Sequence, residues 1–186
     1  NVSTGMNLTL EGEGNDGATL DAGTASRVLV VEGGARLTLR RVHLARGRAG
    51  DGAWGGCVAV SDVDSGGARG LQPLVRIEDA TISECSAARG GCVAVEGGLV
   101  EVWRSVVSRC SASSQAGPAL GGGVYVGWGS VAVYDSDISD CTAASNAGAA
   151  GGSVFVGSGT ATLANTTIVN ASAVGSTPCG GGVDVS

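Results

Sequence analysis

The stretch Gly90–Val95 reads Gly-Gly-Cys-Val-Ala-Val and decides the fold, because it recurs along the chain. An identical copy lies at Gly55–Val60, and variants lie at Gly121–Val126 (GGGVYV), Gly151–Val156 (GGSVFV) and Gly180–Val185 (GGGVDV). Successive copies start 29 to 35 residues apart. A period of this size is typical of stacked repeats, so we predict a solenoid.

The composition agrees with a narrow interior built from small side chains. The chain has 186 residues, of which 34 are glycine and only 3% are aromatic. Valine, alanine, leucine and isoleucine must therefore form the core. The glycines follow no Gly-X-Y period, which excludes collagen. The alternation of valines argues against disorder.

Each repeat contains three short strand patterns and no helical period. In one repeat they are Val93–Val95, Val100–Val102 and Val106–Ser108, and the segment Arg27–Gly47 follows the same order. The sequence therefore predicts an all-β fold, a parallel β-helix with three short strands per coil and about five to six coils. We expect it to be right-handed, as parallel crossovers are. It should form a single domain over residues 1–186, with 1–26 as an irregular first coil, in a longer repeat protein.

Alignment of the repeats gives columns of equivalent residues. An inward column holds large aliphatic residues: Leu44, Ile82, Val107, Ile138 and Ile168. Two corner columns hold small residues and cysteines: Gly47, Cys85, Cys110, Cys141 and Ala171 in one, and Arg27, Cys57, Cys92, Gly123 and Ser153 in the other. Outward positions alternate in charge along one edge (Arg46, Glu84, Arg109, Asp140) and on another sheet (Arg76, Glu101). Such cross-strand pairs stabilise stacked strands modestly.

The six cysteines are candidates for disulfides. Cys57 and Cys92 are equivalent in adjacent repeats, so we predict a bridge between them. Cys85, Cys110 and Cys141 share a column, in which at most one pair can form. Disulfides would imply an oxidising compartment, whereas buried free thiols would act as small apolar residues.

Four sequons for N-glycosylation occur, at Asn1, Asn7, Asn165 and Asn170. The last two lie at predicted coil corners, so they are candidate sites if the protein is secreted by a eukaryote.

An outward row beside the GG strands is the candidate interface. It contains apolar residues: Leu29, Ala59, Ala94, Tyr125 and Phe155. A contiguous apolar row predicts contact with another chain or with a covering loop. It lacks the carboxylate pair that glycoside hydrolysis needs, so no catalytic residue is expected.

Other partners are disfavoured by the sequence. The net charge is −6 and the chain has no lysine, which does not suggest a nucleic-acid partner. No apolar run approaches the length of a membrane span. We expect no cofactor and no metal site: Asp62 and Asp64 in the loop Ser61–Gln72 resemble a calcium loop only faintly, and the later ligands are missing.

The repeats resemble those of chlamydial polymorphic outer membrane proteins, in the GG-x-[VIL] motif followed by Ile-x-x-Cys at Ile82–Cys85 and Ile138–Cys141. That family consists of surface adhesins with a pectin-lyase-like, right-handed β-helix. This chain departs from it, with cysteine for the family's asparagine at 85, 110 and 141 and with isoleucine or valine for its phenylalanine.

The resemblance and the columns together predict a non-enzymatic structural or adhesive β-helix module, extracellular or on the cell surface. We expect it to present a lateral face to partner chains in a surface or filamentous assembly. Its partners would be other protein chains, further repeats of the same chain, or glycans. The alternative is a carbohydrate-active or carbohydrate-binding pectin-lyase-like β-helix, which a surface with convergent acids and arginine beside the GG strands would favour.

Overall fold

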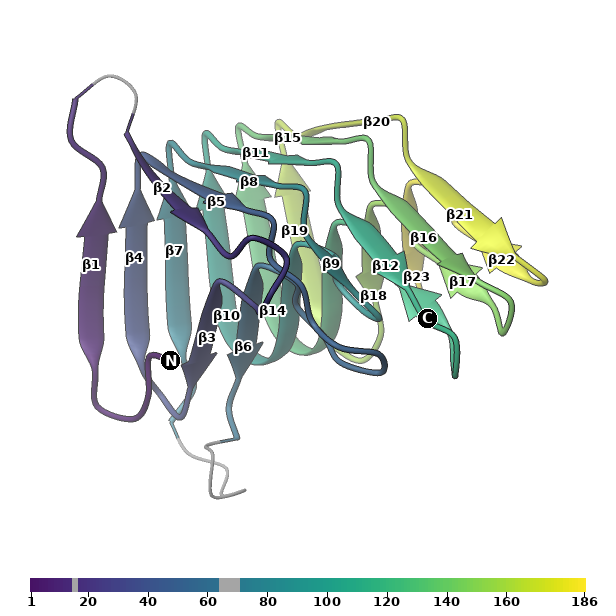
Figure 1. The fold of residues 1–186 in the computed structure, drawn as a ribbon, viewed down its shortest axis with the longest axis horizontal. Coiled ribbons are helices and arrows are strands. Elements are labelled where there is room, and N and C mark those ends of the chain that lie inside the picture. The colour runs from purple at the N-terminus through teal and green to yellow at the C-terminus, as the bar shows by residue number, and fades with distance from the viewer. Residues whose placement is uncertain (15–16, 64–70) are drawn as a thin grey trace.

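The computed structural model describes residues 1–14, 17–63 and 71–186, which form β-strands and no helix. The strands pair in parallel with their equivalents in neighbouring repeats, and Figure 1 shows them stacked from the N-terminal (purple) to the C-terminal end (yellow). This confirms the predicted all-β architecture with parallel strands in stacked sheets, consistent with a β-solenoid. Most of the loop Ser61–Gln72, with the calcium candidate Asp64, lies outside the described residues.

The largest sheet, sheet A, contains both the GG strands and the second strands of the repeats. The GG positions are β3 (Leu29–Glu32), β6 (Val58–Ser61), the first part of β10 (Val93–Trp103), the first part of β14 (Val124–Tyr134), β18 (Val154–Val156) and β23 (Val183–Val185). The second positions are β1 (Asn7–Glu11), β4 (Arg36–Arg40), β7 (Leu74–Glu78), the later parts of β10 and β14, and β19 (Thr160–Ala164).

Sheet B contains the third strands and stacks in the predicted order. Its members are β2 (Ala18–Asp21), β5 (Val42–Ala45), β8 (Thr81–Ser83), β11 (Val106–Ser108), β15 (Asp137–Ser139) and β20 (Thr167–Val169).

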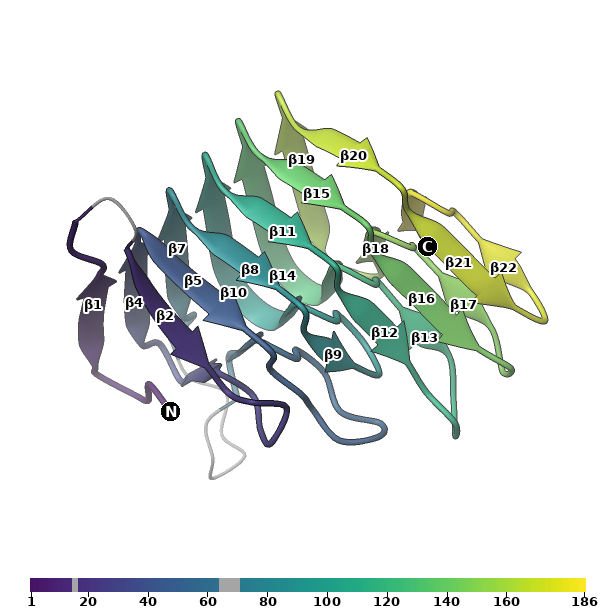
Figure 2. The same ribbon diagram turned by 45° about the horizontal axis from the view of Figure 1, so that its top comes forward.

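Two further sheets form a flank at one side of the stack, as Figure 2 shows. Sheet C contains β9 (Ser86–Ala87), β12 (Ser111–Ser113), β16 (Thr142–Ser145) and β21 (Ser172–Gly175), and sheet D contains β13 (Ala119–Leu120), β17 (Ala149–Ala150) and β22 (Pro178–Cys179). Buried alanines of the flank form a core of their own, with Ala112, Ala119, Ala143 and Ala149.

The strands differ in one respect from the three separate short strands predicted for each coil. The GG strand and the second strand are joined because β10 and β14 continue through a bend instead of ending. Gly97, Gly98 and Gly129 have positive φ values at these bends, and the pairing of β10 with β14 shifts register there. Glycine permits these backbone conformations, which L side chains rarely adopt.

The main core lies between sheets A and B. Leu44, Ile82, Val107 and Ile138 of the predicted inward column are at most 1% exposed. They pack with the inward valines of sheet A, such as Val93. The strand alternation therefore predicted these four residues of the inward column correctly.

Two ladders of corner residues carry the charges. Arg104, Arg109, Asp79 and Glu84 have φ values between 45° and 59°, in the left-handed region. Arg109 lies 3.1 Å from Glu84, as the alternating charges predict, and Arg104 lies 2.8 Å from Asp79 in a second ladder that the sequence analysis missed. The ion pairs bridge residues whose backbone conformation is unfavourable without such support.

The predicted pair on sheet A also forms, with 3.1 Å between Arg76 and Glu101. No helix in the described residues is long and apolar enough to cross a membrane.

Candidate functional site

In β3 the candidate interface row begins at Val30, one residue later than the predicted Leu29. Leu29 pairs with Val58, whose column faces the core, whereas Val30 pairs with Ala59. The prediction that Leu29 points outward is therefore wrong. No Gly-Gly motif precedes this strand to mark where its alternation starts.

The rest of the row is buried rather than exposed. Ala59 and Ala94 are 1% and 0% exposed, and Tyr125 and Phe155 are 7% and 9% exposed. The rings of Tyr125 and Phe155 stack with 5.8 Å between their centroids. Of the two predicted contacts, the structure shows the covering segment of the same chain, so the row is not open to another chain.

The segment that covers the row is the last part of each repeat, next to the following Gly-Gly motif. Trp54, Leu120 and Ala150 pack against the row just before the chain enters the next GG strand. A glycine with positive φ at the start of each motif, such as Gly121 or Gly151, turns the chain back over its own strand. A Cβ on either glycine would meet backbone atoms of the following strand, so the turn requires glycine.

Polar and ionisable side chains gather at the end of this buried row. Glu96 follows the GG strand in β10, and Tyr125 lies on the neighbouring β14. The Arg89 guanidinium carbon lies 5.9 Å from the centroid of the Tyr125 ring. Asp62 approaches the same strand, since a Cβ on Gly97 would stand 2.6 Å from its carboxyl carbon.

Two members of this cluster, Glu96 and Tyr125, have pKa values shifted toward their neutral forms. Burial raises the pKa of the Glu96 carboxyl above its ordinary value, and the charge of Asp62 adds to the shift. Burial also raises the pKa of the Tyr125 hydroxyl, as does the nearby Glu96 charge. Hydrogen bonding between Tyr125 and Glu96 and the Arg89 charge oppose the rise at Glu96. Asp62, Arg89, Glu96 and Tyr125 thus form a polar cluster that the sequence does not predict, in which Glu96 and Tyr125 favour their neutral forms.

The cysteines pair across the two corner columns instead of along them. Cys57 bonds to Cys85 and Cys92 bonds to Cys110, with Cα–Cα distances of 5.6 Å and 5.4 Å. The predicted Cys57–Cys92 bridge is wrong, and no pair forms within the column of Cys85, Cys110 and Cys141. Stacked residues project their side chains in the same direction, whereas the two columns face each other at one corner.

Cys141 keeps a free thiol because its opposite position is Gly123 instead of cysteine. Cys141 is buried, and burial raises the pKa of its thiol to about 11. The other free cysteine, Cys179, is exposed in β22.

All four sequon asparagines are exposed. Asn165 and Asn170 occupy the last corner of each ladder and donate from Nδ2 to Asp135 at 2.6 Å and to Asp140 at 2.9 Å. Asn1 precedes β1, and Asn7 is its first residue.

Within the described residues no group of three histidine, cysteine or acidic side chains is arranged to hold a metal ion. Comparison of the chain with protein-family models, with curated proteins and with solved structures gave no match.

Proposed function

We propose that the chain is a structural module of an extracellular or cell-surface protein, a right-handed β-helix of about five to six coils that pairs through its ends with further repeats or with other chains. The observation that carries the proposal is that both ends of the stack expose apolar side chains and unpaired strands.

The C-terminal end presents five strands, each at the edge of its sheet or paired on one side only: β19, β20, β21, β22 and β23. Val169, Val174, Val183 and Val185 are 41% to 74% exposed there. Unpaired strand edges beside apolar side chains are templates for pairing with another strand.

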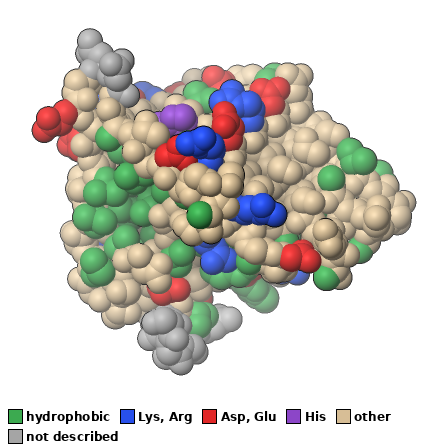
Figure 3. Space-filling view, in the orientation of Figure 1, with side chains coloured by type: hydrophobic (Ala, Val, Ile, Leu, Met, Phe, Trp, Pro, Cys, Tyr) green, Lys and Arg blue, Asp and Glu red, His purple; other side chains and the backbone are tan. Residues whose placement is uncertain are grey.

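The N-terminal end is open in the same way. Leu10, Leu20, Val28 and Leu29 line a depression of about 420 Å³ there. Apolar side chains also gather at this end of the molecule in Figure 3. The first strands, β1 and β2, are the edges of sheets A and B. A coil that continues the columns would bury both ends.

The covalent links support the extracellular assignment. Two disulfides are typical of proteins that fold in a non-reducing environment. Together with the charge ladders, they make the stack suited to a rigid rod. The resemblance to chlamydial surface adhesins points to the same class of function.

Electron microscopy of the 186-residue chain tests the proposal. We expect particles that lengthen at constant width, and we expect the double variant Val174→Lys/Val185→Lys to remain short. The matched control is Val106→Lys, which adds a charge to an exposed valine on the side of sheet B. Equal lengths for all three proteins would contradict pairing through the ends.

A carbohydrate-active protein is the second candidate, and the cluster of Asp62, Arg89, Glu96 and Tyr125 favours it. Acids and an arginine converge there beside the GG strands, where an enzyme of this fold would need them. Glu96→Gln should then abolish release of reducing sugar from a polysaccharide. Release that is unchanged by the substitution, or absent from the unmodified chain, would reject this candidate.

A further inference from the structure

The flank is interrupted at one repeat, and the interruption leaves a notch. The segment between the corner cysteine and the next Gly-Gly has four residues at 86–89, but ten at 111–120 and nine at 142–150. Strand β9 accordingly pairs only Ser86 and Ala87 with β12, and Ser113 has no partner on that side. The notch is therefore the place of a missing strand.

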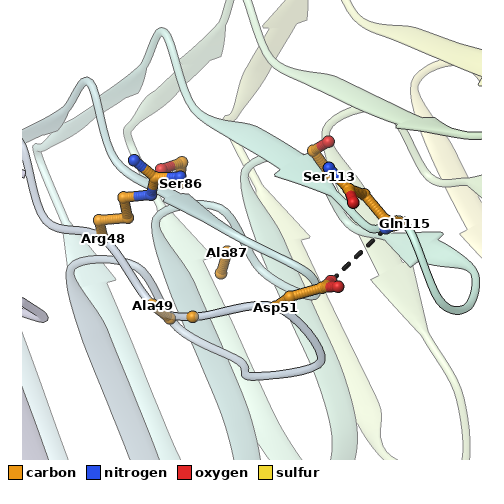
Figure 4. A pocket seen from close by; sticks show the side chains of 8 residues that line it. Arg48, Ala49, Asp51, Ser86, Ala87, Ser113 and Gln115 are labelled. Carbon is orange, nitrogen blue, oxygen red and sulfur yellow. Dashed lines mark hydrogen bonds between the residues drawn. The ribbon is translucent and has the colours of Figure 1, made fainter.

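The notch is a cavity of about 230 Å³ with a polar rim, shown in Figure 4. Ala87 and Ser86 lie between its two walls. Arg48 and Asp51 project from one wall, and Ser113 and Gln115 from the other. The walls belong to repeats two positions apart, which is about 9.6 Å at the usual spacing of stacked strands and leaves room for one strand.

The Asp51 carboxylate lies where a carbonyl group of the missing strand would accept hydrogen bonds. The backbone N–H of Gln115 and the hydroxyl of Ser114 donate to Asp51 Oδ1 at 3.5 Å and 3.4 Å. These distances are at the long limit for hydrogen bonds, so both bonds are weak. An incoming backbone carbonyl would make a shorter bond with the same N–H group.

The rim also carries a cation with no counterion. Among the described residues, the Arg48 guanidinium makes no ion pair and no hydrogen bond, whereas Arg46 nearby is paired with Asp21. Arginine binds carboxylates with two parallel hydrogen bonds. The notch thus combines an open strand edge with a site for a carboxylate.

We propose that this notch binds an extended peptide that adds as the missing flank strand and places a carboxylate on Arg48. Main-chain hydrogen bonds to a strand edge are an established mode of peptide recognition. The carboxylate belongs either to the C-terminus of the peptide or to an acidic side chain. The proposal is independent of the pairing at the ends of the stack.

Calorimetric titration with a short peptide tests the proposal. The probe is acetyl-Thr-Ala-Ala-Ser with a free carboxylate, which copies β16, and its C-terminal amide lacks the charge. We expect saturable binding of the free acid and at least tenfold weaker binding of the amide. An amidated probe that ends in Asp distinguishes the two sources of the carboxylate. Replacement of the second residue by Pro should prevent binding, since proline cannot donate its hydrogen bond.

Two substitutions in the notch are expected to change the dissociation constant of the peptide in opposite directions. Arg48→Ala should raise the dissociation constant at least tenfold, and Asp51→Ala should lower it severalfold, because Asp51 competes for the Gln115 N–H group. Arg36→Ala, an exposed arginine of β4, is the matched control and should leave it unchanged. If Arg48 and Asp51 only stabilised the fold of the notch, both substitutions would weaken peptide binding.

A loop graft tests whether the peptide binds in the notch or at the open ends of the stack. Replacement of residues 86–89 by the sequence of 111–120 would fill the notch and leave the last strands unchanged. We expect the graft to lose peptide binding. Binding that survives the graft, equal binding of acid and amide, or no binding by the unmodified chain would each overturn the proposal.

Discussion

At the residue scale, the corner of each repeat is decided by which side chain occupies each of two facing columns. Cysteine in both columns gives a disulfide, as at Cys57–Cys85 and Cys92–Cys110. Cys141 faces Gly123, and a Cβ on Gly123 would stand 3.2 Å from the Cys141 sulfur. This corner lacks only one cysteine side chain for a third bridge.

Gly123→Cys should therefore form a disulfide with Cys141. The loop would close 18 residues, the same separation as Cys92–Cys110. A loop of this size contributes about 3 kcal/mol to the free energy of unfolding, which urea denaturation would measure. Thiol titration of the denatured protein should find one free thiol, Cys179, in place of Cys141 and Cys179.

The matched control is Ser153→Cys, in the same column one repeat later. Its facing residue is Ala171, so the control should add a free thiol and no bridge. A third bridge in the control, or none in Gly123→Cys, would contradict facing columns.

Glu96 should make stability depend on pH in an unusual direction for an acid. Its folded-state pKa is raised, chiefly by burial, so folding favours the protonated form. The free energy of unfolding therefore falls as pH rises from the ordinary glutamate pKa to the raised value, and then levels off. Glu96→Gln should remove this decline. Urea denaturation from pH 4 to 8, with exposed Glu13→Gln for comparison, measures it; a decline that persists in Glu96→Gln would contradict the assignment.

At the element scale, the flank is a thin pair of sheets held by alanines. Ala143 is 0% exposed between sheets C and D, whereas Ala144 next to it faces the other side of β16. Ala143→Val should lower the free energy of unfolding by about 1–3 kcal/mol through overpacking. Ala144→Val should cost far less, and equal losses in urea denaturation would show that the alanine core is not tightly packed.

The flank also shows which contacts can be predicted from the sequence and which cannot. Strand alternation predicted the inward column from Leu44 to Ile138 and the charge pair of Glu84 and Arg109, because both depend only on local periodicity and stacking. It left open whether another chain or a covering loop contacts the apolar row, because the approach of Trp54 and Leu120 depends on the path of a turn in three dimensions.

The same limit applies to the cysteines and to the polar cluster. Equivalence in the repeats placed Cys57 and Cys92 in one column correctly, but it gave no information on which columns face each other. Glu96 and Tyr125 come together because β10 bends and shifts register at Gly97, and no repeat pattern encodes that approach. A register count could have found the second ladder, because Asp79 and Arg104 are equivalent in successive repeats.

At the scale of the whole molecule, the proposed pairing would join two different ends of the stack. The last corners hold the amides of Asn165 and Asn170, and at the first repeat Glu11 and Asp21 pair with the first arginines of the ladders, Arg41 and Arg46. Contact between such ends is heterologous and does not close on itself, so it generates filaments. Pairing through the ends therefore predicts open-ended growth rather than a dimer.

Sedimentation velocity of the unmodified 186-residue chain over a wide concentration range tests this claim most directly. Pairing through the ends predicts a series of species whose mass grows with concentration while their shape becomes more elongated. A single monomeric species at every concentration, or a dimer that grows no further, would contradict it.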